Sequence, residues 1–167
     1  MKKAVSGIIV FFLILIFPVC LSGQKADFTG TWKLDMSKVP ATGNFPVLIK
    51  ISVSVKADSL LTERFYDTGD GQVYPFKENL TLDGKEHNIT VYEMPRKSTA
   101  RWQEKDSILV MESTTTAYRS DGPVDFRSAE TWSVDNANSI LTISFRNNSP
   151  GGELTGAFIF NRSDGTN

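Results

Sequence analysis

Three glutamates are the first candidates for chemistry, because each falls on the same strand face as large apolar residues. The glutamates are Glu63, Glu78 and Glu130, and their apolar neighbours in phase are Leu61, Phe65, Tyr74, Phe76, Phe126 and Trp132. A carboxylate on an inward face costs free energy unless it is paired, hydrated or protonated. The pattern allows two interpretations. In the first, the glutamates lie at the mouth of a barrel, or a bulge reverses the phase of their strands. In the second, they give a cavity a partly polar lining.

In the second interpretation, aromatic side chains form the walls of the cavity, and the acids favour a polar or cationic ligand over a free fatty-acid carboxylate. The candidate lining residues are Glu63, Phe65, Tyr74, Glu78, Trp102, Glu130, Trp132, Phe145 and Phe158. Arginines near the loops would add a mixed rim, formed by Arg64, Arg101, Arg119 and Arg127.

Signals for catalysis, metals and cofactors are weak. His87 is the single histidine, which favours a solvated turn residue over a catalytic base. The turn at 67–71 has a faint resemblance to a calcium loop but lacks its later ligand positions. No Gly-x-Ser-x-Gly motif or phosphate loop occurs. We therefore expect no catalytic residue, metal site or cofactor, with an enzyme using the inward glutamates as the remaining alternative.

The first 23 residues are typical of a secretory signal peptide. Lys2 and Lys3 precede an apolar run that is shorter than a membrane span, and small residues follow near Gly23. An alternative is a lipoprotein anchored through Cys20, although Val19 is large for the position before the acylated cysteine. Cleavage leaves residues 24–167 as one domain with a net charge of about −3 and no cysteine, which argues against nucleic-acid binding and excludes disulfides.

This domain must be built from strands, because period-two alternation and turn residues recur every 8–12 positions or so. We expect strands over 28–34, 47–56, 60–67, 73–82, 87–93, 96–103, 108–118, 126–134, 141–145 and 154–162. Short turns favour pairing in chain order. The prediction is an all-β fold with a single antiparallel up-and-down β-barrel of about 8–10 strands, and a sandwich is the competitor.

The first and last of these strands resemble those of the calycin superfamily. Gly30-Thr31-Trp32 matches the Gly-x-Trp of its first strand, and Arg162 stands where an arginine packs across that tryptophan to close the barrel. The segment 28–34 also resembles fatty-acid-binding proteins. However, there is no room for their helical lid, and Phe160-Asn161-Arg162 replaces their Arg-x-Tyr. The chain thus looks like a bacterial secreted lipocalin-like domain.

The resemblance implies an exported, non-enzymatic barrel, in the periplasm or outside the cell, whose partner is a small hydrophobic or amphipathic molecule. The alternative is an envelope interaction protein whose barrel is filled by side chains and whose function lies on loops such as 120–125. A continuous internal void would favour ligand binding, whereas a filled barrel with an exposed apolar patch would favour the alternative.

Overall fold

The computed structural model describes residues 26–39, 46–103, 107–137 and 139–163, and this part of the chain is all-β. The expected leader, 1–23, lies outside the described residues. The strands are β1 (Gly30–Leu34), β2 (Val47–Lys56), β3 (Ser59–Asp67), β4 (Val73–Thr81), β5 (His87–Val91), β6 (Met94–Gln103), β7 (Ile108–Arg119), β8 (Gly122–Asp135), β9 (Ile140–Ser149) and β10 (Gly152–Arg162). A short 3-10 helix, η1 (Met36–Lys38), follows β1, and the Asp35 side chain caps it.

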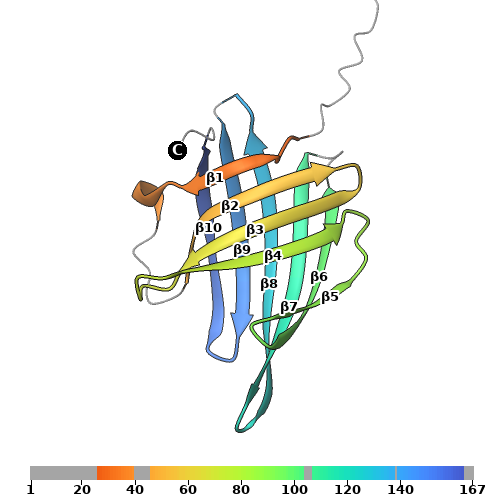
Figure 1. Ribbon diagram of the computed structural model, residues 1–167, viewed down its shortest axis with the longest axis vertical. Coiled ribbons are helices and arrows are strands. Elements are labelled where there is room, and N and C mark those ends of the chain that lie inside the picture. Colours follow the sequence, from red (N-terminus) through yellow and green to blue (C-terminus); the bar gives the residue numbers. More distant parts are fainter. Residues whose placement is uncertain (1–25, 40–45, 104–106, 138, 164–167) are drawn as a thin grey trace, which may run out of the picture.

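All ten strands belong to one antiparallel sheet in the order β4-β3-β2-β1-β10-β9-β8-β7-β6-β5. Consecutive strands pair with one another, except β4 and β5, which are the two edges of the sheet. In addition, β1 pairs with β10 and joins the two ends of the chain. Figure 1 shows β1–β4 crossing in front of the strands β7–β10. The predicted up-and-down barrel is confirmed, and the sandwich is not what forms.

The barrel is nearly closed, and side chains bridge the seam between its two edges, β4 and β5–β6. Thr81 on β4 contacts the Nε2 atom of His87 on β5 through its hydroxyl, at 2.8 Å. The Tyr92 hydroxyl donates to the Pro75 carbonyl at 2.8 Å. These side-chain contacts satisfy polar groups along the two sheet edges, where no continuous backbone ladder joins the strands.

One end of the barrel is filled with apolar side chains. Fully buried rings from three parts of the chain meet there, and they belong to Phe28, Trp32, Trp132 and Phe160. The Trp32 indole N–H donates to the Phe28 carbonyl at 2.9 Å, so this buried donor is satisfied. We call this half the closed end. The closed end contains most of the buried apolar core.

Arg162 closes the sheet over Trp32, as the calycin-like pattern predicts. The two residues are direct partners in the β1–β10 ladder, and the guanidinium carbon lies 4.5 Å from the indole centroid. Gly30 has a φ of 142°, and a Cβ there would meet Arg162 at 3.4 Å. A side chain at position 30 would therefore crowd the arginine and strain the backbone.

Replacing Arg162 with alanine is expected to lower the free energy of unfolding by about 0.5–2 kcal/mol, the range of a cation–π contact. Arg162→Lys should recover part of this loss, because an ammonium keeps the charge but not the planar stacking. Urea denaturation followed by Trp emission measures both. Unchanged stability in Arg162→Ala would show that the backbone ladder alone closes the barrel.

Two local features of the strands depart from regular alternation and from the expected bounds. In β2 the pairing register shifts between Leu48 and Lys50, and this irregularity turns Leu48 into the core. In the β5–β6 hairpin, Pro95 does not end a strand. Tyr92 and Glu93 form the turn with φ values of 47° and 67°, and Pro95 lies inside β6. Positive φ is uncommon for such residues, so the sequence does not signal this turn.

Candidate functional site

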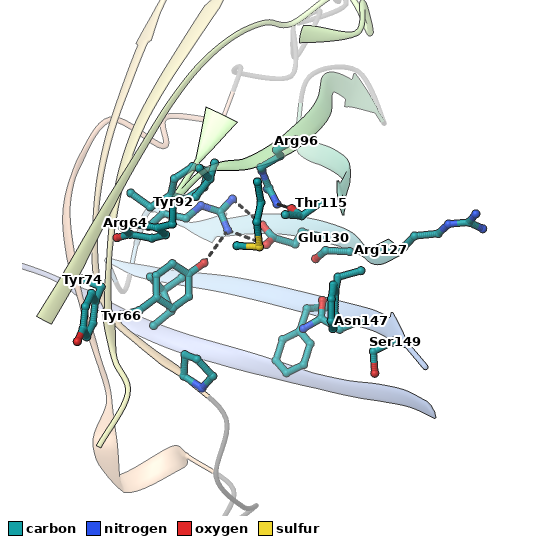
Figure 2. Close-up of a pocket in the computed structure, with 18 of the residues that line it drawn as sticks. Arg64, Tyr66, Tyr74, Tyr92, Arg96, Thr115, Arg127, Glu130, Asn147 and Ser149 are labelled. Atoms are coloured by element: carbon teal, nitrogen blue, oxygen red, sulfur yellow. Dashed lines mark hydrogen bonds and ion pairs between the residues drawn. The ribbon is translucent and has the colours of Figure 1, made fainter. Parts of the chain in front are cut away.

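The opposite end of the barrel contains a cavity of about 680 Å³. Residues from nine strands, β2 to β10, line it together with neighbouring loop positions (Figure 2). They are Pro46, Leu48, Arg64, Tyr66, Thr68, Tyr74, Phe76, Val91, Tyr92, Met94, Arg96, Thr115, Phe126, Arg127, Ser128, Glu130, Ile143, Phe145, Asn147, Asn148, Ser149 and Phe158. We call this half the open end.

Aromatic rings dominate one wall of the cavity. Phe145 on β9 and Phe158 on β10 stack with their ring centroids 4.9 Å apart. Gly156, the ladder partner of Phe145, leaves the space in which that ring lies, because a Cβ at position 156 would approach the ring to 2.8 Å. The wall thus offers a flat apolar surface to a guest molecule.

The floor of the cavity holds a buried ion pair. Arg64 on β3 donates from Nη1 to Glu130 Oε1 at 2.7 Å and from Nη2 to Glu130 Oε2 at 2.8 Å. The arginine is only 2% exposed and the glutamate 13%. The Trp132 indole N–H donates to the same Oε2 at 2.8 Å. This bidentate geometry is the strongest form of the Arg–carboxylate contact.

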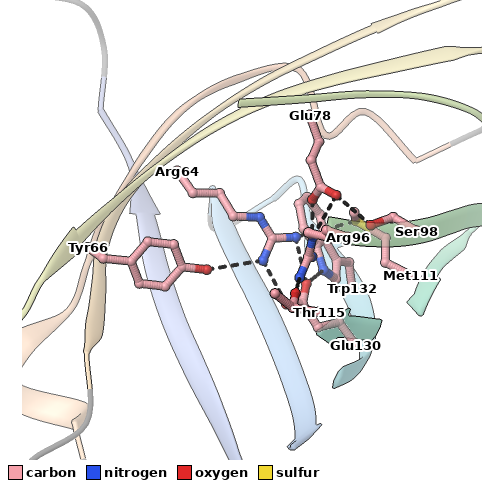
Figure 3. A network of polar contacts seen from close by, with 9 residues as sticks. All are labelled: Arg64, Tyr66, Glu78, Arg96, Ser98, Met111, Thr115, Glu130 and Trp132. Atoms are coloured by element: carbon pink, nitrogen blue, oxygen red, sulfur yellow. Dashed lines mark hydrogen bonds and ion pairs between the residues drawn. The ribbon is translucent and has the colours of Figure 1, made fainter. Parts of the chain in front are cut away.

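A second ion pair lies beside the first and crosses the seam between β4 and β6 (Figure 3). Arg96 donates from Nε and Nη2 to the two carboxylate oxygens of Glu78, at 2.9 and 3.3 Å. The Ser98 hydroxyl donates to Glu78 Oε1 at 2.6 Å. Arg96 also donates from Nη1 to the Thr115 hydroxyl at 3.1 Å. Glu78 therefore has its charge balanced and its oxygens hydrogen-bonded inside the barrel.

The surroundings of the first pair keep both groups charged. Burial alone would raise the pKa of Glu130, but the charge and hydrogen bonds of Arg64 outweigh it, and the pKa is lowered. Burial alone would lower the pKa of Arg64, whereas Glu130 holds it well above its ordinary value. Glu130 is thus a fixed anion rather than a proton donor at neutral pH, which does not favour an acid–base reaction in the cavity.

A pH dependence of stability follows from Glu130. A carboxyl with a lowered folded-state pKa stabilises the fold above its unfolded-state value of about 4.3. That stability is lost as pH falls through the lower folded-state pKa. Thermal unfolding across the acid range should show wild type losing more stability on acidification than the double variant Arg64→Met/Glu130→Leu, which lacks this titration. Parallel acid profiles for the two proteins would contradict the assignment.

The structure places the expected lining residues in three regions, which are the cavity, the closed-end core and the outer face of β3. Tyr74, Glu130, Phe145 and Phe158 lie in the cavity wall or floor, and Glu78 is buried next to the floor. Trp132 is buried in the closed-end core, and Trp102 packs against that core near Phe28, so neither tryptophan lines the cavity.

The predicted inward face of β3 is wrong. Leu60, Thr62 and Arg64 are buried, which turns Glu63 and Phe65 to the outer face. There Glu63 pairs with Lys77 at 3.1 Å, in contact with solvent. The β3 sequence carries apolar residues in both phases, so alternation alone does not choose between them.

The sequence prediction missed Arg64 and Arg96 as parts of the floor. It placed Arg64 with Arg101, Arg119 and Arg127 on a rim, but Arg64 is buried. The backbone of Arg101 forms an isolated β-bridge with Asp83, and Arg101 does not line the cavity. Arg127 does line the mouth and is solvated. Two buried glutamates require cations, and this requirement was the signal that could have indicated inward arginines.

Among the remaining chemical candidates, the 67–71 turn contributes only Thr68 to the cavity lining. Within the described ranges, no group of three or more His, Cys, Asp or Glu side chains could hold a metal ion. The segment 67–71 is a turn in which Asp67 and Asp70 accept backbone N–H groups at 2.7 and 2.9 Å. Among the described residues no helix has the length and apolar character needed to cross a membrane.

Comparison of the chain with protein-family models, with characterised proteins and with solved structures gave no match. The function must therefore be argued from the cavity itself.

Proposed function

We propose that this protein is an exported lipocalin-like carrier that binds a small, partly apolar molecule in the open end of its barrel. The observation that supports this is the cavity of about 680 Å³, with a stacked Phe145–Phe158 wall and a charged floor. Pockets for small molecules commonly measure about 300–1,000 Å³ and combine apolar walls with a few placed polar groups. The export part of the proposal depends on the leader-like pattern of residues 1–23.

Several features favour a carrier over a barrel filled by side chains. The closed end contains the large rings, Trp32, Trp132, Phe28 and Phe160, and so carries the stability of the fold. The open end leaves its rings partly accessible to the cavity. A fold that needed only a packed core would gain by burying this apolar surface, since unfilled volume costs stability.

Ligand extraction and a probe titration test the proposal. Residues 24–167 would be purified and analysed by native mass spectrometry, with identification of any small molecule released on denaturation. The neutral dye N-phenylnaphthylamine should bind with increased emission and should be displaced by amphipathic competitors. A protein that carries no molecule and binds no dye would contradict the carrier function and favour the interaction protein.

Substitution at Gly156 should weaken binding by reducing the cavity. A valine there forces the Phe145 ring out of its position and toward the cavity, because the new Cβ would lie 2.8 Å from it. We expect dye affinity to fall by about tenfold and stability to fall by about 1–3 kcal/mol through overpacking. Gly151→Val is the matched control, because position 151 offers ordinary space. Equal dye affinity in both variants would place the ligand elsewhere.

A further inference from the structure

The cavity floor, taken together with Glu78 buried next to it, contains two positive and two negative charges and therefore has no net charge. Arg64 neutralises Glu130, and Arg96 neutralises Glu78, each through two hydrogen bonds. The other charged lining residue, Arg127, stands at the mouth with 72% of its side chain exposed. Its field is screened by water and adds little inside the barrel.

Although the floor is neutral overall, most of its unused hydrogen-bonding capacity consists of donors. A guanidinium has five N–H groups, and the ion pair occupies two of those on Arg64. The remaining contacts of its terminal nitrogens, to Tyr66 Oη and Met111 Sδ, are both 3.5 Å long. The buried Arg64 Nε has no hydrogen-bond partner among the described residues.

The carboxylates, by contrast, are well supplied with donors. Glu130 accepts from Arg64 and from Trp132, and Glu78 accepts from Arg96 and from Ser98. A ligand ammonium group would have to compete with these arginines for the same oxygens. The cationic ligand that the sequence suggested is therefore disfavoured by the pairing.

We propose that the ligand is a neutral amphipathic molecule whose carbonyl, ester or hydroxyl oxygen accepts hydrogen bonds from the floor arginines, and that the site discriminates against carboxylates. This deepens the proposed carrier function and rests on it. An anionic head would bring a net negative charge into an apolar enclosure beside Glu130 and would have to displace that glutamate from Arg64. A neutral acceptor bonds to the spare terminal N–H groups of the floor arginines and leaves both ion pairs intact.

A head-group series at constant chain length tests this in the wild-type protein. Dodecanol, methyl dodecanoate, dodecanoate and dodecylammonium would compete with bound N-phenylnaphthylamine at a mildly alkaline pH that keeps the acid ionised. We expect the alcohol and the ester to bind at least about tenfold more tightly than either ion. Displacement by dodecanoate at the same concentration as the ester would overturn the proposal while leaving the carrier function in place. Absence of dye binding would instead overturn the carrier function.

Glu130→Gln gives an independent readout because it leaves Arg64 positively charged on the floor. Dodecanoate affinity should rise by at least about tenfold in this variant, whereas ester affinity should change by less than about threefold. Glu63→Gln removes a carboxylate from the outer face and is the matched control, expected to leave the head-group preference unchanged. Equal preferences in Glu130→Gln and Glu63→Gln would contradict the proposed role of the floor.

If Glu130→Gln is too unstable for dye titration, the shift in Tm on adding ligand provides the same test. A ligand that binds only the folded state raises Tm, so dodecanoate should stabilise Glu130→Gln and not wild type. The double variant Arg64→Gln/Glu130→Gln restores a neutral floor and should lose the gain in dodecanoate binding. Retention of that gain in the double variant would assign the anion to Arg127 or Arg96 instead.

Discussion

Replacing Glu130 with leucine is expected to destabilise the fold by about 3–5 kcal/mol, the usual cost of removing one partner of a buried ion pair. The reason is the burial of Arg64, which is 2% exposed and would keep a full charge without its hydrogen-bonded anion. Neighbouring groups cannot replace the carboxylate, because Tyr66 and Met111 lie 3.5 Å away and are neutral. The charge of Glu78 also acts on Arg64, but Glu78 is already paired with Arg96. Urea unfolding of the purified variant measures the loss.

The double variant Arg64→Met/Glu130→Leu should recover most of this stability, because it removes both charges and replaces them with apolar groups. The pair Lys77–Glu63 on the outer face is the matched control. With exposures of 68% and 33%, its disruption in Glu63→Leu should change stability by less than about 1 kcal/mol. If Glu130→Leu were as mild as Glu63→Leu, water would have to reach Arg64, and the floor would not be a dry ion pair.

The second large effect is expected at the closed end, where Trp32→Ala should cost about 3–5 kcal/mol. Trp32 is fully buried, its N–H is bonded to the Phe28 carbonyl, and Arg162 lies across its ring. The substitution removes core volume, leaves a buried carbonyl without its donor and takes away the surface on which the arginine rests. Chemical denaturation reports the loss.

Trp32→Phe separates these contributions, because phenylalanine keeps a ring under Arg162 but lacks the indole N–H and part of the volume. Its cost should fall between those of Arg162→Ala and Trp32→Ala. A double-mutant cycle between positions 32 and 162 then isolates the cation–π contact. Additive effects of Trp32→Ala and Arg162→Ala would show that the two side chains do not interact energetically.

Much of the fold follows from local patterns in the chain. The ranges expected for β4, β7 and β10 agree with the structure to within a few residues, since alternation and turn residues act over short distances. The link between Trp32 and Arg162 was also predictable, although the residues lie far apart in sequence. It required the calycin-like pattern, because no local rule pairs a first strand with a last one.

The candidate site was predicted only in part. Glu78 and Glu130 lie on strands with a single clear apolar phase, and both point inward as expected. Glu63 lies on β3, where Leu60 and Leu61 give both faces an apolar residue, and its predicted face is wrong. The cavity itself depends on side-chain volumes summed across many strands, which no single segment contains.

The sequence by itself determined an all-β chain of ten strands in up-and-down order. It did so because turn chemistry and period-two alternation are properties of neighbouring residues. Only the tertiary structure decided which cation faces which carboxylate, and hence that the cavity floor is neutral. Arg64 and Glu130 are 66 positions apart, and the free energy of their pairing exists only when the curled sheet brings both into one dry space.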